Sequence, residues 1–237
     1  ELMTLGLHPS FSLLCLIYSW SSGAFVGWTS LFDAMLSPYA AYSEKFIGYL
    51  SFVSTIAYIM GGIVSSWIVD KYIPRRMKAV LLLSCIFSAI FTGLFCLSVP
   101  SIFGSGPYGV IGGGKWWLLF VCFVLGFPNG AAAPIFYEFA AQITFPVSEG
   151  SSASALSLFE NFGALFLYEG IARMSSNQAV NGIFTFGMLM CVWAMFFVKE
   201  EYRKADAEDE MTETIYSRIS ERSSEHTPLL SNWSLGS

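Results

Sequence analysis

Charged residues are scarce in this sequence. Asp, Glu, Lys and Arg together make up 12% of its 237 residues, whereas ordinary soluble domains carry about 25%. Hydrophobic residues make up 54% and aromatic residues 17%, which leaves too little polar side-chain surface to cover a water-facing globule. This composition argues against a soluble enzyme, a nucleic-acid-binding protein and a disordered chain.

The few charges are also unevenly placed. Of the 29 charged residues, 14 lie after residue 198, and nine of these are acidic. Residues 1–198 therefore carry 15 charges with a net charge of −1. Because no basic field is present to attract phosphate groups, we expect no nucleic-acid partner.

Clustered metal ligands are missing as well. The five cysteines each lie in an apolar run and the two histidines are isolated, whereas a metal site needs Cys or His at short spacing. We interpret the cysteines as small buried hydrophobic residues and expect neither a metal ion nor a cofactor. The sequence starts at Glu1, with no initiator Met and no signal peptide, which predicts a fragment that lacks an N-terminal part.

Long apolar runs are what the sequence has instead. A helix that crosses a bilayer needs about 20 mostly apolar residues, and no segment shows the alternation typical of barrel strands. Six segments are long and apolar enough: residues 10–35, 46–69, 79–99, 116–139, 151–172 and 180–198. The sequence thus predicts an all-α membrane protein with six transmembrane helices in residues 1–198. Residues 199–237 are polar and rich in Ser, which predicts a disordered tail.

Basic residues near the span ends predict the orientation, since Lys and Arg are enriched on the cytoplasmic side of membrane proteins. Seven of them lie in the loop after the second span or at the start of the tail, against three on the opposite side. Both chain ends and the 70–78 loop are therefore expected in the cytoplasm.

The loop after the second span has the pattern Ser66-x-x-x-Asp70-Lys71-x-x-x-Arg75-Arg76. An Asp at the end of one helix can pair with an Arg at the start of the next, so Asp70, Arg75 and Arg76 are candidate gating residues. A plain cytoplasmic loop is the alternative. The pattern resembles the signature loop of the major facilitator superfamily, although Ser66 stands where a Gly is usual. Six spans and a cytoplasmic tail resemble the C-terminal half of its twelve-helix fold.

Two further stretches narrow the resemblance. One runs from Gly27 to Pro38 as Gly-Trp-x-x-Leu-x-Asp-x-x-Leu-x-Pro, and the other begins at Pro134 as Pro-Ile-Phe-Tyr-Glu-Phe and ends at Gly150. Together they resemble the feline-leukaemia-virus-receptor-related family of haem and choline transporters, above all its lysosomal member, although Gln142 replaces a common Glu. The resemblance implies alternating-access transport of a small organic cation or vitamin, such as choline or pyridoxine. It implies a lysosomal or endosomal membrane, with the plasma membrane as the alternative.

Polar residues recur along the fifth span. Ser154, Ser157, Asn161 and Tyr168 follow helical spacing, which puts them on one face of the helix. Such a face is either a close packing surface or the wall of a polar cavity. The family resemblance favours a substrate-binding role for Asn161, and we include Ser157 from the same face.

Glu160 lies beside Asn161 near the middle of this span. Burial disfavours the charged form of a carboxylate, so Glu160 is a candidate both for substrate binding and for carrying a proton. A structural ion pair with a Lys or Arg outside this sequence is the alternative. Protons are therefore expected as a partner only if Glu160 carries a proton during transport.

Aromatic residues mark the first span. Tyr18 and Phe25 share a face with Ser22, and Trp28 lies nearby. Aromatic faces attract cations by about 0.5–2 kcal/mol, which makes Tyr18 and Trp28 candidate substrate-binding residues. Simple packing between helices is the alternative.

The fourth span contains Pro128 and Pro134. Each proline removes a backbone donor and favours a kink, and interrupted helices often border the sites of transporters. We therefore predict that this span is a gating helix.

The tail contains Glu225-His226-Thr227-Pro228-Leu229-Leu230. This stretch resembles the acidic dileucine signal that clathrin adaptors read, with Glu225, Leu229 and Leu230 as the sorting residues. The expected partners are thus a small-molecule substrate, the lipid bilayer and a clathrin adaptor.

A non-transporting membrane scaffold or receptor with a trafficking tail is the alternative function. An enzyme is disfavoured, because neither His lies in a span and the sequence offers no paired intramembrane aspartates.

Overall fold

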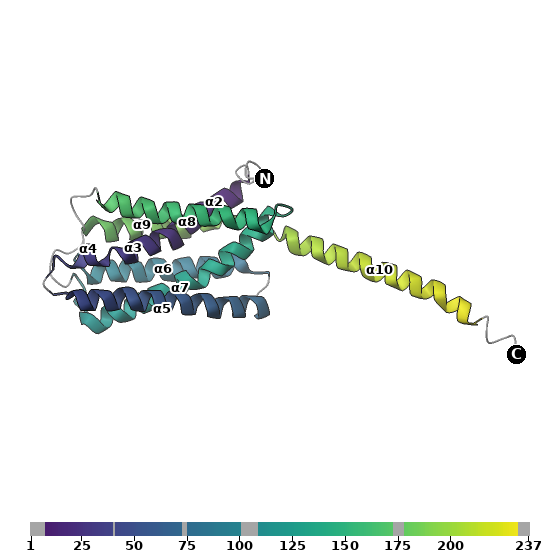
Figure 1. Cartoon of the computed structure of the whole chain (residues 1–237), viewed down its shortest axis with the longest axis horizontal. Coiled ribbons are helices and arrows are strands. Elements are labelled where there is room, and N and C mark those ends of the chain that lie inside the picture. The colour runs from purple at the N-terminus through teal and green to yellow at the C-terminus, as the bar shows by residue number, and fades with distance from the viewer. Residues whose placement is uncertain (1–7, 40, 73–74, 101–108, 173–177, 232–237) are drawn as a thin grey trace.

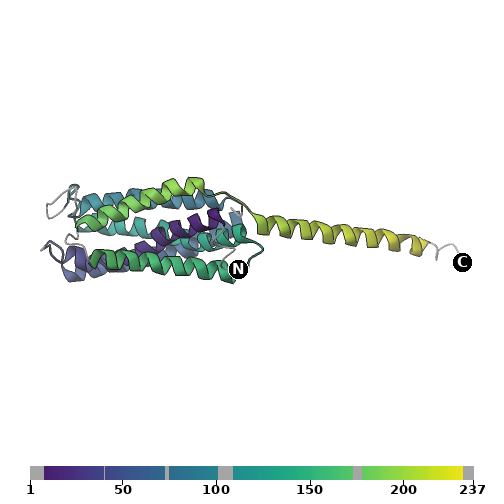
Figure 2. The same cartoon turned by 90° about the horizontal axis from the view of Figure 1, so that it is seen from above.

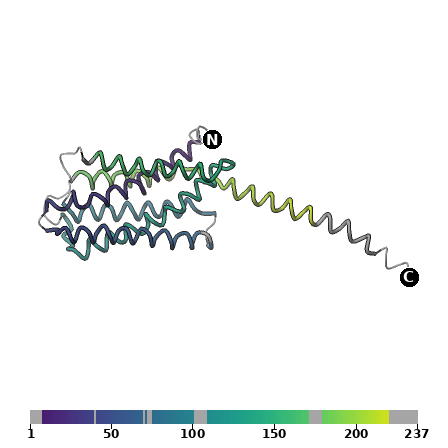
Figure 3. Tube along the Cα trace, viewed as in Figure 1, coloured from purple at the N-terminus to yellow at the C-terminus, as the bar shows by residue number. Residues whose placement is uncertain are grey.

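The computed structural model describes residues 8–39, 41–72, 75–100, 109–172 and 178–231, and these ranges contain helices and no strand. In chain order the elements are α2 (Pro9–Tyr18), the π-helix η1 (Ser19–Ala24), α3 (Phe25–Ser30), α4 (Phe32–Leu36), α5 (Glu44–Tyr72), α6 (Met77–Ser98), α7 (Gly114–Thr144), α8 (Glu149–Ala172), α9 (Gln178–Phe197) and α10 (Arg203–Ser231). Figure 1 shows the elements up to α9 side by side in one elongated bundle. Within it α5 packs on α7, α6 on α7 and α9, and α8 on η1 and α3. Figure 3 shows the course of the chain through the bundle.

Five segments of the described chain are long and apolar enough to cross a membrane: Pro9–Ser30, Glu44–Val69, Met77–Ser98, Gly114–Thr144 and Ala179–Phe197. They overlap five of the six expected spans. Helix α8 has the length for the sixth, with 24 residues, but its three glutamates and four serines lower its hydropathy. That α8 crosses the membrane stays a prediction.

The first span is irregular. The chain passes from α2 through the π-helix η1 into α3, and Leu31, with φ −96° and ψ 3°, separates α3 from α4. Thr29 and Ser30 both donate their hydroxyl to the Val26 carbonyl, which competes with regular backbone bonding. The two prolines of the fourth span, Pro128 and Pro134, lie within one 31-residue helix, α7. That this helix acts as a gate stays a prediction.

Two helix pairs approach so closely that only glycine fits between them. A Cβ atom on Gly23 of η1 would lie 2.0 Å from the Glu160 carbonyl oxygen, and one on Gly163 of α8 would lie 2.0 Å from the Ser19 carbonyl oxygen. On the other side of the bundle, a Cβ on Gly130 of α7 would lie 1.8 Å from the Tyr58 carbonyl oxygen. Small residues at such crossings are typical of membrane helices. These contacts fix η1 against α8 and α5 against α7.

The buried apolar residues form two clusters. One surrounds Trp28 and Phe184 and takes its first-span residues from 24–36, whereas the other surrounds Phe136 and Phe139 and takes them from 11–18. Ser21 and Ser22 of η1 are buried but belong to neither cluster. The polar part of the first span therefore lies between two apolar regions.

The structure differs from the expectation of a disordered tail. Residues 203–231 form helix α10, which extends away from the bundle (Figure 2). Ala, Glu, Arg, Lys and Met, all strong helix formers, are frequent in its first half, and no Gly or Pro occurs between residues 203 and 227. Asp206 in the first turn also interacts favourably with the helix dipole. A polar composition thus did not exclude a helix.

We predict that Gly163→Ala destabilises the protein, because its new methyl group would overlap the Ser19 carbonyl. Overpacking of this kind costs about 1–3 kcal/mol of unfolding free energy. Gly48→Ala in α5 is the matched control, since nothing lies within 4 Å of its Cβ position and alanine favours helix by about 1 kcal/mol. Thermal unfolding of the purified protein in detergent measures both. Equal changes in the two midpoints would contradict the close crossing.

Candidate functional site

A carboxylate and two hydroxyl groups meet between the two apolar clusters. Ser22 of η1 donates its hydroxyl to Glu160 Oε1 of α8 at 2.6 Å. The Ser22 Oγ also lies 3.0 Å from the Tyr58 hydroxyl of α5. Three elements that are distant in sequence thus contribute one hydrogen-bonded chain.

A second polar group adjoins the first. The Tyr137 hydroxyl of α7 lies 2.9 Å from Ser157 Oγ of α8, and the Tyr18 ring of α2 meets the Tyr137 ring edge-on with centroids 5.5 Å apart. We call these six residues the polar cluster: Tyr18, Ser22, Tyr58, Tyr137, Ser157 and Glu160.

The polar cluster combines one charge with hydroxyl groups and aromatic rings. Tyr18 and Ser22 are fully buried, whereas Tyr58, Tyr137, Ser157 and Glu160 are half-buried. Among the described residues, no ion pair joins Glu160 to a basic side chain. A carboxylate can bind a cation by charge and aromatic faces add to the attraction, so this arrangement suits a small cation or a proton. No group of three or more potential metal ligands occurs in the described part of the chain.

The structure brings together Glu160, Ser157 and Tyr18 of the predicted binding residues. Asn161 lies apart, because successive residues of a helix point about 100° away from each other. Its side chain is exposed and donates to the Ser157 carbonyl of its own helix at 2.7 Å. Asn161 therefore takes no part in the polar cluster, although Ser157 of the same predicted face does.

Trp28 also lies apart from the polar cluster. Its side chain is completely buried, stacks on Phe184 with centroids 4.9 Å apart and donates its indole N–H to Asn181 Oδ1 of α9 at 2.8 Å. These contacts place it in an aromatic core, where its one polar atom already has a partner. Packing is thus the structural role of Trp28.

Sequence reasoning missed Tyr58 and Tyr137 as members of the cluster. Each is a single tyrosine within a long apolar span, where a hydroxyl needs a partner. Tyr137 also stands in the stretch that carries the family resemblance. These signals could have found both residues, but not the partner that each one meets.

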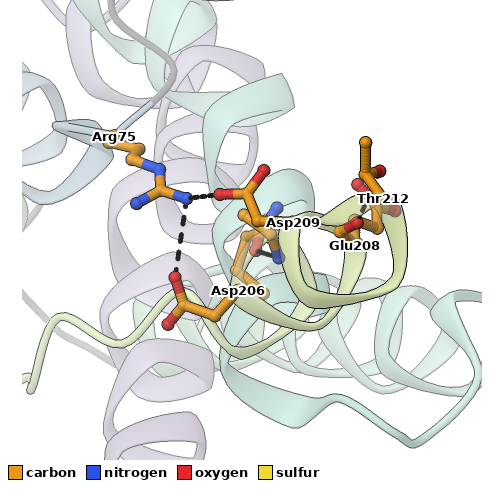
Figure 4. A network of polar contacts seen from close by, with 7 residues as sticks. Arg75, Asp206, Glu208, Asp209 and Thr212 are labelled. Atoms are coloured by element: carbon orange, nitrogen blue, oxygen red, sulfur yellow. Dashed lines mark hydrogen bonds and ion pairs between the residues drawn. The ribbon is translucent and has the colours of Figure 1, made fainter. Parts of the chain in front are cut away.

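The loop between α5 and α6, which the sequence predicted to act as a gate, contacts the start of the tail helix α10. Arg75 forms ion pairs with Asp206, at 3.5 Å, and with Asp209 of α10 (Figure 4). The side chain of Asp70 lies outside the described residues, so its expected pairing with the arginines stays a prediction. Arg76 is exposed.

The first turn of α10 is also bonded to two other parts of the bundle. Lys204 pairs with Glu149 at the start of α8 at 2.7 Å, and this hydrogen bond raises the pKa of Lys204. Gln142 near the end of α7 accepts a hydrogen bond from the Ala205 N–H at 3.1 Å. The start of the tail helix thus contacts the ends of α7 and α8.

The start of α6 and the end of α9 are joined in the same region. The Tyr202 hydroxyl accepts from the Met77 N–H at 2.9 Å, and Lys78 donates to the Phe196 and Val198 carbonyls at 3.2 and 2.6 Å. Both contacts satisfy backbone groups that a helix end leaves unpaired. The side chains of the sorting residues, Glu225, Leu229 and Leu230, lie outside the described part of α10.

Comparison with known proteins gives relatives along most of the chain, although no protein-family model matches it. It is 30% identical over 187 residues to the choline/ethanolamine transporter FLVCR1 of Felis catus, and 24% identical over 216 residues to FLVCR2 of Homo sapiens. The matches cover 77% and 86% of this chain but only 30% and 37% of the relatives. An uncharacterized MFS-type transporter of Caenorhabditis elegans is 25% identical over 206 residues. The chain spans about a third of the length of these relatives.

Solved structures show the same fold. The inward-open xylose transporter XylE of E. coli matches with a TM-score of 0.60 and 17% identity, over 84% of this chain and 49% of that one. A D-xylose-proton symporter matches with a TM-score of 0.58, over 91% of this chain and 53% of that one. The predicted all-α membrane fold is confirmed, and this chain matches about half of each of these solved structures.

We predict that Arg75→Glu loosens the start of α10, because it would place a negative charge beside Asp206 and Asp209. Exposed ion pairs contribute about 0.2–1 kcal/mol each, so amide hydrogen exchange in residues 203–209 should speed up by about two- to tenfold. Arg76→Glu makes the same charge change at the neighbouring exposed arginine and should have a smaller effect. Exchange that is equally fast in both variants would contradict the assignment.

Proposed function

We propose that this chain is part of a carrier that moves a small organic cation across a membrane by alternating access. The proposal rests on its similarity to the feline-leukaemia-virus-receptor-related choline/ethanolamine transporters of the major facilitator superfamily. Its relatives are carriers and not enzymes. Because the chain covers about a third of these relatives, the activity and the substrate are proposed for the protein that contains this chain.

The single observation that supports this function best is Glu160 in the polar cluster. An ionised carboxylate between two apolar regions costs several kcal/mol unless a charge or strong hydrogen bonds compensate it. Ser22 donates one hydrogen bond, which offsets only part of that cost. A bound cation would supply the rest, and Tyr18, Tyr58 and Tyr137 are placed to add aromatic attraction to it.

The geometry around the polar cluster suits alternating access. The π-helix η1 interrupts the first span next to Glu160, and broken helices beside the substrate site are common in carriers. Four of the six cluster residues are only half-buried in this unit. A second helical unit packed against them would cover these side chains, in keeping with the match to about half of each xylose transporter.

Proton coupling through Glu160 is the finer form of the proposal. A site that binds either a cation or a proton exchanges one for the other as the pH changes. The alternative, a structural ion pair with a basic residue of the second unit, would leave transport independent of this exchange. Asn161 is a substrate contact only if the second unit brings the substrate to its exposed face of α8. Trp28 is fully buried and offers no such face in this conformation.

We predict that Glu160→Gln abolishes the pH dependence of uptake, because glutamine cannot exchange a proton. Uptake of choline, ethanolamine and pyridoxine by the full-length protein in liposomes, at several pH values, measures this. Glu169→Gln, an exposed glutamate of the same helix, should retain the wild-type profile. A Glu160→Gln profile like that of the wild type would refute proton coupling, and the absence of saturable uptake of any cation would favour the scaffold or receptor.

We further propose residence in a lysosomal or endosomal membrane, directed by the tail, with the plasma membrane as the alternative. The count of basic residues supports a cytoplasmic tail. Helix α10 projects from the bundle (Figure 2), and the 27 residues from Arg203 to Leu229 span about 40 Å at 1.5 Å each. A clathrin adaptor could therefore reach the Glu225–Leu230 motif well clear of the bilayer.

We predict that replacing Leu229 and Leu230 together by Ala moves the full-length protein from lysosomes to the plasma membrane, because the adaptor would lose its two apolar contacts. Fluorescence microscopy and surface biotinylation measure the shift. The double replacement of Ile215 and Ile219 by Ala, which removes two exposed apolar side chains of the same helix, is the control. An unchanged location of the dileucine variant would refute the signal.

A further inference from the structure

We propose that a groove between the first span and α9 binds one acyl chain of a phospholipid, whose phosphate group meets Lys199 at the end of the groove. The inference goes beyond the proposed function and does not depend on transport. It starts from an apolar groove of about 420 Å³, which α2 and η1 line on one side and α9 lines on the other.

The walls of the groove are hydrocarbon. The lining residues are Leu, Ile, Trp, Phe, Gly, Met, Cys and Ala, so none of them is charged and none carries a hydroxyl group. The Trp20 indole N–H in this lining is already donated to the Phe184 carbonyl at 3.3 Å. The Cys191 thiol is donated to the Ile17 carbonyl at 3.8 Å. A polar ligand would therefore lose its hydration here without gaining a side-chain partner, whereas an acyl chain has no polar group to satisfy.

Trp20 forms the floor of the groove together with Gly187. A Cβ atom on Gly187 would lie 1.9 Å from a carbon atom of the Trp20 ring, so the indole rests directly on the backbone of α9. The polar cluster meets the same π-helix through Ser22, which bonds to Glu160 of α8 and adjoins Tyr58 of α5. The groove and the polar cluster thus adjoin η1 through different residues and different neighbouring helices.

The groove lies within the part of the chain that crosses the membrane. Both of its walls belong to segments that are long and apolar enough to do so, Pro9–Ser30 and Ala179–Phe197. On α9 its rim continues into a stripe of exposed side chains at helical spacing, Phe186, Met190, Trp193 and Phe197. The groove is therefore continuous with the apolar surface that faces the bilayer. No water is present there to fill it, and an empty gap would forfeit the dispersion contacts of its lining.

The length of the groove matches one leaflet of a bilayer. On α9 it extends from Ile183 to Ala194, and these 11 steps along the helix correspond to about 16 Å. The hydrocarbon core of a bilayer is about 30 Å thick, so the groove covers about half of it. Trp20 and Gly187 lie near the middle of their spans, whereas Leu13 lies near the end of its span. The groove thus runs from one membrane surface to about the midplane, as an acyl chain of that leaflet does.

A cation lies at the surface end of the groove. Lys199 follows the end of α9, and its backbone N–H donates to Ser10 Oγ of α2 at 3.4 Å, so it joins the two helices that line the groove. Lys199 is exposed and forms no ion pair within the described ranges. Lipid phosphate groups lie at the level of the span ends, and basic residues there attract them. This charge complementarity favours a phospholipid over a sterol, which has no phosphate.

We predict that Leu16→Trp and Met190→Trp each displace the acyl chain, because an indole on either wall would occupy its place. Lost contact with even two methylene groups lowers occupancy by about tenfold. The full-length protein is reconstituted in phosphatidylcholine vesicles that contain a phosphatidylcholine with a diazirine in its acyl chain. Photocrosslinking followed by peptide mass spectrometry measures labelling of residues 13–20 and 183–194.

Three further points keep the test specific. Leu189→Trp makes the same change at an exposed residue of α9 that lies outside the groove, and it should retain the label. Lys199→Gln should lower labelling less than the tryptophan variants, since the acyl chain keeps its contacts. Leu16 and Met190 are both exposed and lie on different helices, so either variant carries the test if the other fails to fold.

Each outcome decides between the acyl chain and another occupant. Labelling that is concentrated in the groove, lost in both wall variants and retained in Leu189→Trp would support the site. Equal labelling of Met190 and Leu189 in the wild-type protein would indicate ordinary bilayer contact and overturn it. Displacement of the label by added cholesterol would point to a sterol instead. A crosslink to another part of the protein from benzoylphenylalanine in place of Leu16 would show that a second helical unit covers the groove.

Discussion

The contact between η1 and α8 is the constraint on which the rest of the site depends. Their backbones touch because Gly23 and Gly163 have no side chain to separate them. At this distance Ser22 reaches Glu160 with a short hydrogen bond. One methyl group in the crossing would push the helices apart and break the bond. Small residues here therefore act on function as well as on packing, since they set the distance between the two polar side chains.

Energetics favour a functional interpretation of Glu160 over a purely structural one. A hydrogen bond to a charged group contributes about 1.5–3 kcal/mol, whereas an uncompensated charge in an apolar interior costs more than that. The apolar clusters on either side cannot supply the difference. Because Glu160 is only half-buried, water, a cation or a proton at its open side can compensate the rest.

The tail-facing end of the bundle is held by many weak contacts. Arg75, Lys204 and Gln142 each tie the start of α10 to a different part of the bundle. Such exposed pairs contribute little individually, so the junction can open at low cost. The short hydrogen bond at the polar cluster therefore holds its helices more firmly than these exposed contacts hold the tail.

The sequence by itself determined the class of the molecule and part of the site. Hydropathy and length fixed the apolar helices, because bilayer thickness sets their length, and polarity within a span marked Glu160, Ser157 and Tyr18. It could not decide between Glu160 and Asn161, since neighbouring residues point to different faces and only packing selects one. Trp28 lies in an aromatic core, and this too depends on packing that the sequence does not show. The place of Tyr58 in the polar cluster and the docking of α10 depend on hydrogen bonds across 36 and 63 residues, so only the tertiary structure decided them.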